Sequence, residues 1–270
     1  MSIVVTGASG MLGSAVVREL LEQGEKVVAL VRDRAKATNV LPASRALTVL
    51  TGDVTDPAHW DSVLPGADGV VHTAAYFREY YTPAHQGAEA DRQMFRTNVL
   101  AVRELLEAAH RHGVGCVVHV SSTSVLAGDQ QHPVDETSRF RPKPNGYAAS
   151  KIAAERTVRA HAGVRVPQIL PAWMWGPRDA GPTSAGRLLL GIARSQLRAL
   201  PAAGTHIVDA RDVALACCRA LESGSHAQRY VVAGRWTPLR EVAEIVARDC
   251  QVPVPRQVPV RLAVAVAILL

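Results

Sequence analysis

The stretch Val5-Thr6-Gly7-Ala8-Ser9-Gly10-Met11-Leu12-Gly13 decides the fold of this chain. An apolar run typical of a strand precedes it, and an amphipathic helical pattern begins within it. In such a turn Gly7 permits the sharp change of direction, Gly10 lets the backbone approach a pyrophosphate, and Gly13 lets the helix pack closely on the strand. The unpaired N–H groups and the positive dipole end of the helix suit phosphate groups. The stretch therefore predicts a dinucleotide-binding turn.

The first two-thirds of the chain alternates short apolar runs with longer helical patterns. The apolar runs are nearly continuous, as expected for strands buried on both faces. We expect strands at residues 2–6, 26–31, 47–51, 69–73, 116–121 and 166–170, and helices at 11–22, 92–112 and 147–161. This alternation predicts an α/β fold with a doubly wound parallel sheet of the Rossmann type.

After Pro177 the pattern becomes less regular. We expect helices at 184–199, 209–222 and 238–249, the last with Pro238 in its first helical position, and short strands near 206–208 and 229–233. We assign residues 1–176 to the dinucleotide-binding domain and 177–270 mainly to a smaller C-terminal substrate lobe, from which residues of about 205–222 return to the core. The apolar tail 260–270 is far short of the ~20 residues that span a bilayer, so we expect a core-packing helix. It ends without a stop signal, which leaves open whether the natural chain extends past Leu270.

Composition narrows the class of protein. Of the 270 residues, 48% are hydrophobic and 20% are charged, which is an ordinary globular balance. The net charge is +6, but Lys and Arg are scattered without a basic run, which argues against nucleic acid as a partner. The chain opens on a strand rather than a signal peptide, and its four cysteines form no CxxC pair. We therefore expect a cytoplasmic protein with free thiols and without a membrane partner.

The end of the second predicted strand bears on the choice of cofactor. In a doubly wound fold this position faces the adenosine ribose, where an acidic residue binds the 2′-hydroxyl of NAD and an arginine binds the 2′-phosphate of NADP. Arg32 stands there, with Asp33 next to it. We predict NADP and keep NAD as the alternative. Asp53, after the third strand, is expected to bind the adenine amino group, although it could also belong to the cap of the next helix.

Tyr147-Ala148-Ala149-Ser150-Lys151 places a phenol and an ammonium group four residues apart on one face of a helix. A tyrosine with a pKa near 10 is a poor acid–base catalyst at neutral pH, and a nearby ammonium group lowers that pKa. The pair predicts a proton-transfer site, although a YxxxK pair also occurs on helix surfaces by chance.

Hydroxyl groups follow the fifth predicted strand in Val120-Ser121-Ser122-Thr123-Ser124. The carboxyl ends of parallel strands face the ligand crevice, so one of these hydroxyls can hold a substrate oxygen. Serine clusters are also common in loops, so the prediction rests on the combination with the glycine turn and the Tyr/Lys pair.

The combined motifs resemble the extended short-chain dehydrogenases/reductases, within which the chain is most similar to the dihydroflavonol-reductase-like branch of the NAD-dependent epimerases/dehydratases. The resemblance covers essentially the whole chain. The branch assignment rests on Val31-Arg32-Asp33 and on the run from Gly181-Pro182-Thr183 to Ala214. The matching stretches are Thr6 to Gly13, Gly52-Asp53-Val54, His72-Thr73-Ala74-Ala75, Ser121-Ser122, Tyr147 to Lys151, Pro171, Gly176-Pro177, and Val208 to Ala214.

The resemblance implies a catalytic set of Ser122, Tyr147 and Lys151, with Thr123 as the alternative hydroxyl. It also implies nucleotide-binding positions along the chain, and a homodimer that pairs the helices at 92–112 and 147–161. Where the family often has Arg-Pro this chain has Leu170-Pro171, and we expect the backbone there to meet the nicotinamide amide. The expected cofactor-binding residues are Gly7, Ser9, Gly10, Met11, Leu12, Arg32, Asp53, Val54, Thr73, Ala74, Ala75, Tyr147, Lys151 and Pro171.

Three functions fit these observations. The first is reduction of a ketone or aldehyde to an alcohol, or the reverse, by hydride transfer. The second is a nucleotide-sugar epimerase, with Arg187, Arg194, Arg198 or Arg211 against a diphosphate, although those arginines also fit a solvated helix face. The third is a non-catalytic sensor of the cofactor, which the Tyr/Lys pair argues against.

Aromatic residues gather in the loop after the fourth strand, residues 76–85. We weigh two interpretations, a substrate wall facing Trp173 and Trp175, and ordinary packing of the lobe. Either one gives an apolar, aromatic pocket, which favours a hydrophobic carbonyl or alcohol substrate over a sugar nucleotide. We expect no bound metal.

Overall fold

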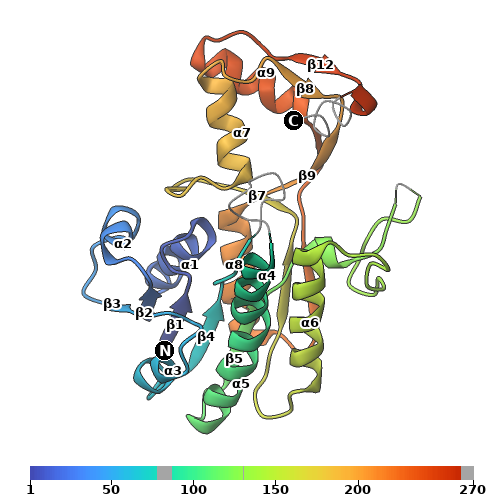
Figure 1. Cartoon of the computed structure of the whole chain (residues 1–270). Coiled ribbons are helices and arrows are strands. Elements are labelled where there is room, and N and C mark those ends of the chain that lie inside the picture. The colour runs from blue at the N-terminus through green and yellow to red at the C-terminus, as the bar shows by residue number, and fades with distance from the viewer. Residues whose placement is uncertain (78–86, 130, 263–270) are drawn as a thin grey trace.

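The computed structural model describes residues 1–77, 87–129 and 131–262. Its centre is a seven-stranded sheet in the order β10-β6-β5-β4-β1-β2-β3, with every pair parallel (Figure 1). The chain begins in the middle of the sheet and winds to both sides, which confirms the predicted doubly wound fold. The strands are β1 (Ser2–Thr6), β2 (Lys26–Val31), β3 (Leu47–Thr51), β4 (Gly69–His72), β5 (Cys116–Val120), β6 (Gln168–Pro171) and β10 (Arg229–Val232).

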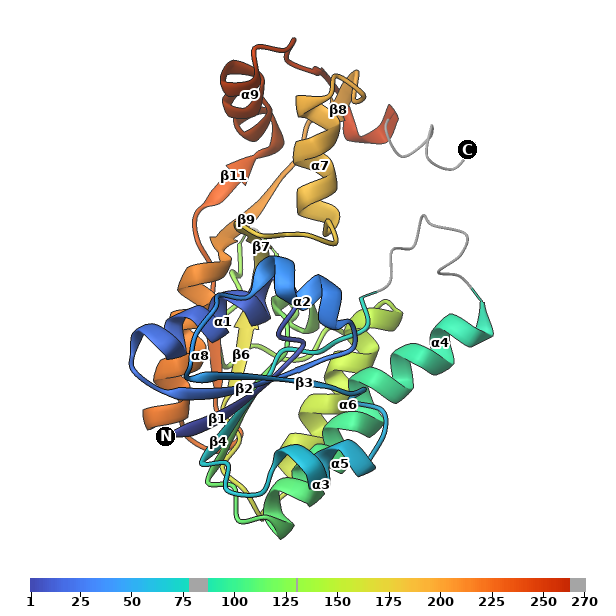
Figure 2. The ribbon, with the colours of Figure 1, turned by 90° about the vertical axis from the view of Figure 1, so that its left-hand side faces the viewer.

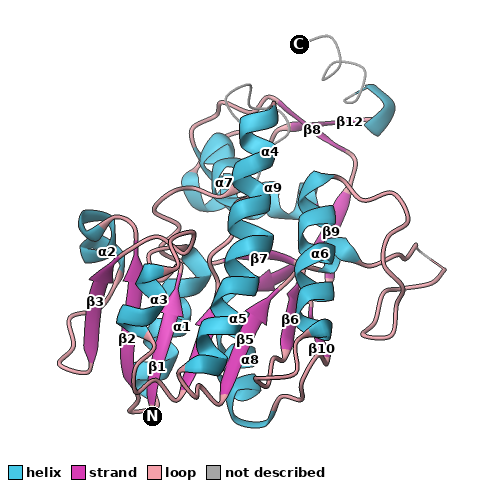
Figure 3. Cartoon of the chain, turned by 60° about the horizontal axis from the view of Figure 1, so that its bottom comes forward, coloured by secondary structure: helices cyan, strands magenta, loops and turns pink. Residues whose placement is uncertain are grey.

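Both faces of the sheet are buried, which explains why the strands are apolar without alternation. On β1, for example, Ile3 and Val5 belong to one core and Val4 to the other. Helices α1 (Met11–Glu22), α2 (Arg34–Val40) and α8 (Ala210–Ser223) cover one face, and α3 (Ala58–Val63), α5 (Ala101–Arg111) and α6 (Gly146–Ala160) cover the other (Figure 3). The six strands and the helix at 11–22 lie where the sequence predicts them, within two residues at each end.

The long helix expected at 92–112 is three segments. It begins earlier than predicted, with α4 (Ala88–Phe95), and passes through a π-helical turn, η2 (Arg96–Leu100), into α5. Insertions of this kind are often found at functional sites because they turn a side chain out of the regular helical repeat. The residue that η2 presents in this way is Asn98.

A smaller lobe stands over the carboxyl edge of the sheet (Figures 1 and 2). Its elements are two small sheets, β11-β9-β7 and β12-β8, with two helices, and its own core joins Ile192, Leu200 and Ala243. They are β7 (Trp173–Trp175), α7 (Ser184–Ala193), β8 (Ala199–Pro201), β9 (Gly204–Asp209), β11 (Trp236–Pro238), α9 (Leu239–Cys250) and β12 (Arg256–Val258). Between these segments the chain goes back to the large sheet, because α8 packs on α1 and β10 pairs with β6.

Two helix boundaries in the lobe differ from the prediction. Helix α7 ends at Ala193 instead of 199, because Ser195 takes a left-handed conformation with φ of 55° and the chain continues into β8. Pro238 precedes α9 as its N-cap rather than occupying its first turn. The predicted tail helix lies largely outside the described residues, which end at 262. No helix of the described ranges is both long and apolar enough to cross a membrane.

Candidate active site

The glycine turn between β1 and α1 packs closely against its own backbone and that of the chain after β4. Gly7 has φ of +64°, a conformation that other residues rarely adopt, and a Cβ atom there would lie 2.8 Å from the Ala74 backbone nitrogen. A Cβ atom on Gly13 would lie 2.2 Å from the Gly7 carbonyl oxygen. Helix α1 begins after Gly10 without a side-chain cap and without an acidic residue in its first turn. Its first N–H groups are therefore available to a phosphate, and the chain fits a bound dinucleotide.

A cavity of about 210 Å³ opens at this turn. The predicted cofactor residues around it come from the ends of β1, β2, β3 and β4, which meet at the carboxyl edge of the sheet. They are Gly7, Ser9, Gly10, Arg32, Asp53, Val54, Thr73, Ala74 and Ala75. Met11 and Leu12 are buried at the start of α1, and Tyr147, Lys151 and Pro171 do not line this cavity. The lining also contains residues that were not among the predicted cofactor-binding residues, which are Leu30, Val31, Lys36, Gly52, Tyr76 and Thr97.

Charged groups at the adenosine end of the cavity favour an anion. Arg32 and Lys36 both line it. The Asp33 carboxylate instead accepts a hydrogen bond from the Lys36 backbone N–H at 3.0 Å, as the N-cap of α2. Partial burial acts to raise the pKa of Asp53, but hydrogen bonds from Thr55 and the charge of Arg32 hold it below its usual value.

Tyr147 and Lys151 lie one turn apart on α6, next to the end of β5. The Lys151 ammonium group is 3% exposed and donates to the Val120 carbonyl oxygen at 2.8 Å, with Nζ 6.0 Å from the centre of the Tyr147 ring. Burial lowers the pKa of Lys151, and the negative charge of Glu155 raises it in part, which leaves the pKa at about 8.

One expectation about this pair changes. In the protein alone burial raises the pKa of Tyr147, and the neighbouring ammonium group does not reverse that shift. Tyr147 is therefore a protonated phenol at neutral pH, the form that gives a proton to a substrate oxygen.

The hydroxyls after β5 have different surroundings. Ser122 caps a short 3-10 turn, η3 (Thr123–Val125), and its Oγ accepts a hydrogen bond from the Ser124 backbone N–H at 3.2 Å. Thr123 Oγ1 donates to the Pro171 carbonyl oxygen at 3.2 Å, so it lies beside the residue expected to meet the nicotinamide. Both side chains are partly exposed at the carboxyl edge of the sheet.

Ser121 points away from this edge into a buried ion pair. Its Oγ donates to Glu155 Oε1 at 2.6 Å, and Arg229 Nε of β10 donates to Glu155 Oε2 at 2.9 Å. Arg229 also donates to the Ser138 carbonyl oxygen at 2.7 Å and stacks 4.5 Å from the centre of the Phe140 ring. These hydrogen bonds link the end of β5 and helix α6 to β10 at the edge of the sheet. Because the Ser121 hydroxyl is engaged in this buried cluster, it is not one of the hydroxyls that could bind a substrate.

Asn98 is a functional candidate that sequence reasoning missed. Its side-chain amide accepts from the Tyr76 backbone N–H at 2.7 Å and donates to the Tyr76 carbonyl at 2.9 Å. It also donates to Ser150 Oγ at 3.0 Å, next to Lys151. The π-helical turn thus holds both the loop after β4 and the helix of the Tyr/Lys pair. A buried asparagine within an apolar helical pattern was the available signal.

The aromatic ring of Phe77 borders the pair. Phe77, which is 52% exposed, lies edge-on to Tyr147 with ring centres 4.9 Å apart. Trp173 and Trp175 of β7 contact each other edge-on at 4.9 Å, and Trp173 Nε1 donates to Ser184 Oγ at 3.3 Å. Residues 78–86 of the aromatic loop lie outside the described ranges.

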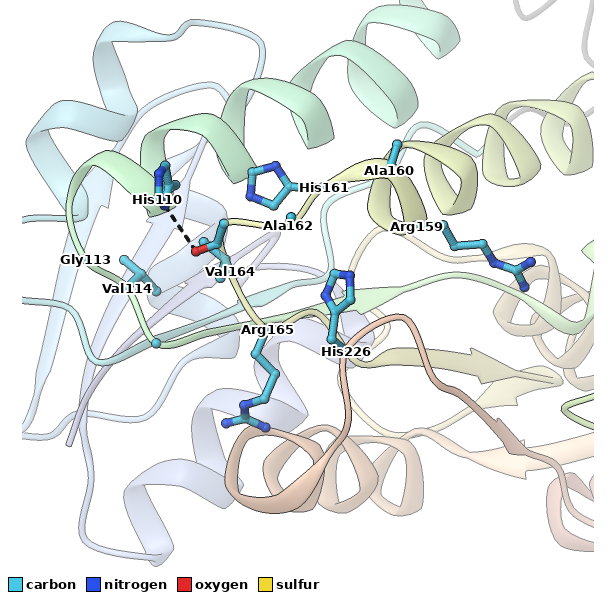
Figure 4. Close-up of a pocket in the computed structure, with 12 residues that line it drawn as sticks. His110, Gly113, Val114, Arg159, Ala160, His161, Ala162, Val164, Arg165 and His226 are labelled. Carbon is cyan, nitrogen blue, oxygen red and sulfur yellow. Dashed lines mark hydrogen bonds between the residues drawn. The ribbon is translucent and has the colours of Figure 1, made fainter.

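A larger hollow, of about 830 Å³, lies at the opposite, amino edge of the sheet and is rich in His and Arg (Figure 4). Two of its basic side chains already have partners among backbone carbonyl groups. Arg165 donates to three carbonyl oxygens at the end of α8, and His110 shares a hydrogen bond with the Gly163 carbonyl oxygen at 3.1 Å. Arg165 thus satisfies the end of α8, and His110 holds the loop after α6. The predicted cofactor and catalytic residues lie instead at the carboxyl edge of the sheet. Within the described ranges, no three His, Cys, Asp or Glu residues are gathered as metal ligands.

The fold and this arrangement define an NAD(P)-dependent oxidoreductase with a Rossmann domain. The model of the NAD dependent epimerase/dehydratase family matches residues 3–233, and the chain belongs to that family, whose members of this type are extended short-chain dehydrogenases/reductases. It is 32% identical to sterol demethylase protein B of Methylococcus capsulatus, over all of this chain and 81% of that protein. It is 30% identical to a putative dihydroflavonol 4-reductase of Synechocystis, over 93% of this chain and 73% of that protein.

Solved structures agree with the fold. The crystal structure of DesIV, a dTDP-glucose 4,6-dehydratase of Streptomyces venezuelae with NAD bound, superposes with a TM-score of 0.82 at 25% identity, over 96% of this chain and 84% of that one.

A further sequence relative is matched over only part of its length. A 3 beta-hydroxysteroid dehydrogenase/Delta 5-->4-isomerase of Mycobacterium tuberculosis is 36% identical over 66% of this chain, but this match spans about half (48%) of that protein.

Proposed function

We propose that this protein reduces a hydrophobic ketone or aldehyde to an alcohol with NADPH. The observation that carries the proposal is the Tyr147/Lys151 pair on α6, beside partly exposed hydroxyls at the end of β5 and an aromatic surface. The glycine turn and the cavity beside it would hold the cofactor, which supplies the hydride when bound.

The residues of the chain perform the proton transfer and orient the substrate. Tyr147 donates its proton to the substrate oxygen, and its raised pKa keeps that proton in place at neutral pH until charge develops on the substrate. Lys151, as a cation on the same helix face, stabilises the phenolate that remains. Ser122 or Thr123 donates a hydrogen bond to the substrate oxygen. The Thr123 hydroxyl donates to the Pro171 carbonyl oxygen, whereas the Ser122 Oγ accepts a hydrogen bond from the Ser124 N–H, and paired Ser122→Ala and Thr123→Val variants decide between them.

A hydrophobic substrate fits the aromatic surface better than a sugar nucleotide does. Phe77 lies exposed against the proton donor. Of the arginines that could bind a diphosphate, Arg211 is paired with Asp209 at 2.6 Å, and Arg187 donates to the Pro182 carbonyl oxygen. The names of two relatives, a sterol demethylase protein and a dihydroflavonol reductase, agree with this substrate class. An epimerase acting on a sugar nucleotide is the second candidate, because the matching family includes NAD-dependent epimerases.

The choice of NADPH rests on the two cations at the adenosine end. A 2′-phosphate would gain charge-assisted hydrogen bonds from Arg32 and Lys36, each worth about 1.5–3 kcal/mol, and Asp33 is engaged as a helix cap. We expect Arg32→Ala or Lys36→Ala to weaken NADPH about 10- to 100-fold and to leave NADH nearly unchanged. Arg34→Ala is the matched control, because Arg34 is absent from the cavity lining and donates to the Val49 carbonyl oxygen.

The experiment compares kcat/KM for NADPH and NADH in the wild type and these variants, with a panel of apolar ketones and aldehydes against UDP-hexoses. A wild-type preference for NADH would contradict the cofactor assignment. Turnover of the UDP-hexoses without turnover of any carbonyl on the panel would favour the epimerase.

A further inference from the structure

A row of buried polar residues crosses the large sheet directly beneath the site. Backbone register places Thr6 of β1, His72 of β4, His119 of β5, Gln168 of β6 and Arg229 of β10 side by side. All five are at most 5% exposed. The residues two positions earlier on β1, β4 and β5 belong to the core under α3, α5 and α6, so the row faces these helices (Figure 3).

The middle of the row lacks protein partners for several of its polar atoms. We call His72, His119, Gln168 and the adjoining Trp60 the buried polar layer. The His72 ring stacks on His119 with centres 6.0 Å apart and meets Trp60 edge-on at 6.5 Å. The unpartnered atoms are Trp60 Nε1, His72 Nε2, both ring nitrogens of His119, and Gln168 Oε1. They are five of the nine such buried atoms in the described ranges, so the deficit is concentrated here.

Internal water explains this concentration. Native proteins satisfy nearly all their buried polar groups, and where protein atoms do not serve, ordered water does. A buried water molecule makes about three hydrogen bonds and needs both donors and acceptors around it. The layer offers both, because the indole N–H donates, the Gln168 oxygen accepts, and a neutral imidazole does each with one nitrogen. We propose that the buried polar layer encloses internal water and that this hydrated layer solvates the Lys151 ammonium group.

The layer lies within electrostatic reach of Lys151. Lys151 Nζ bonds the carbonyl oxygen of Val120, the residue after His119, and an ammonium group has three donors. Burial first, and the charge of Lys151 second, lower the pKa of both His72 and His119, so the two rings are neutral and compatible with the cation.

Other ionisable groups face Lys151 from each packed element. They are Tyr147 and Glu155 on α6, with Arg229 of β10 paired to Glu155, and His72 and His119 from β4 and β5. The π-helical turn η2 adds Asn98, which does not titrate. The charge of Glu155, which is shared with Arg229, offsets the desolvation of Lys151 only in part, so the neutral, hydrated side of the sheet supplies the remaining solvation.

A change to the layer therefore moves the protonation of Lys151. Replacing His119 by leucine removes two polar ring atoms and their water, which deepens the desolvation of the ammonium group and lowers its pKa further. The catalytic significance of this rests on the proposed role of Lys151 beside Tyr147. The layer itself can be measured without turnover.

The test is the dependence of unfolding free energy on pH, from urea titrations between pH 6 and 10. The pKa of Lys151 is about 8 in the fold and 10.5 in the unfolded chain, so the contribution of Lys151, measured as the difference from Lys151→Met, rises with pH above 8. The buried thiols of Cys116, Cys217 and Cys218 and the phenol of Tyr147, whose pKa values burial raises, act in the opposite direction above about pH 9 and cancel in that difference. We expect Lys151→Met to lose this rise, and His119→Leu to begin it roughly one pH unit lower. Gln168→Leu should act in the same direction, and Val117→Ala, on the same face of β5, should destabilise without moving the onset.

The proposal would be overturned if the pH at which the unfolding free energy begins to rise were the same in His119→Leu and Gln168→Leu as in the wild type. A high-resolution crystal structure without water on the ring nitrogens of His119 would also overturn it. If Tyr147→Phe retains turnover while the onset still moves, the proposed function fails and the layer stands. If Tyr147→Phe loses turnover and the pH at which stability begins to rise does not move in the layer variants, the hydrated layer fails and the proposed function stands.

Discussion

Acidification should destabilise this protein through its two buried histidines. Burial, and then the charge of Lys151, hold the pKa of His72 at about 3 and that of His119 well below 6.5, the value for an exposed ring. As the pH falls through 6.5 the unfolded chain takes up protons that the fold does not bind. Stability is therefore fully present above pH 6.5 and is lost progressively below it.

The magnitude follows from the width of the window. Between pH 6.5 and pH 5 each ring that stays neutral in the fold costs about 2 kcal/mol, at about 1.4 kcal/mol per pH unit. The two rings together give about 4 kcal/mol, a large share of the roughly 5–15 kcal/mol by which a typical protein is stable.

Urea unfolding followed by tryptophan fluorescence at pH 7 and pH 5 measures this loss. His119→Leu should remove about half of it, whereas the exposed His226→Leu should behave as the wild type. A loss below about 1 kcal/mol in the wild type, or an equal loss in His119→Leu, would refute the reasoning, because it would mean that the rings accept protons inside the fold.

Two further variants test the framework of the site. Gly10→Val would place a branched side chain at the turn, where even a Cβ atom lies 3.2 Å from the Gly7 carbonyl oxygen. We expect the NADPH affinity measured by calorimetry to collapse while the circular dichroism spectrum stays that of the folded protein. Unchanged NADPH affinity would show that the turn has a purely structural role. Arg229→Met leaves Glu155, which is 0% exposed, without its cationic partner. We therefore expect the free energy of unfolding in urea to fall by about 3–5 kcal/mol. A fall of less than about 1 kcal/mol would show that Glu155 takes up a proton or finds another partner at little cost.

The sequence predicted the dinucleotide half of the molecule well, because its signals are local. The glycine turn, the continuous apolar strands and the Tyr/Lys spacing each depend on neighbours within a few residues. Strand β1 and helix α1 therefore lie at the predicted residues. The nine predicted cofactor residues at the cavity come together because parallel strands end at one edge.

The misses depend on contacts distant in sequence. Lys36 was overlooked because α2 is a short helix, and its place in the cavity lining is visible only where α2 meets the ends of β2 and β3. The in-register stacking of His72 and His119, which are 47 positions apart, requires the order of the sheet. The π-helical turn at Asn98 is invisible to a periodicity that assumes one continuous helix. The three-residue strands of the lobe are shorter than any pattern can identify.

The most direct test of the account is turnover by Tyr147→Phe. The variant removes one hydroxyl group and keeps the ring that Phe77 contacts, so folding and NADPH affinity should stay close to those of the wild type. General acid catalysis typically contributes 10²–10⁴-fold, so we expect kcat for carbonyl reduction to fall by about 100-fold or more. A variant that binds NADPH normally and keeps more than about a tenth of the wild-type rate would contradict the assignment of Tyr147 as the proton donor.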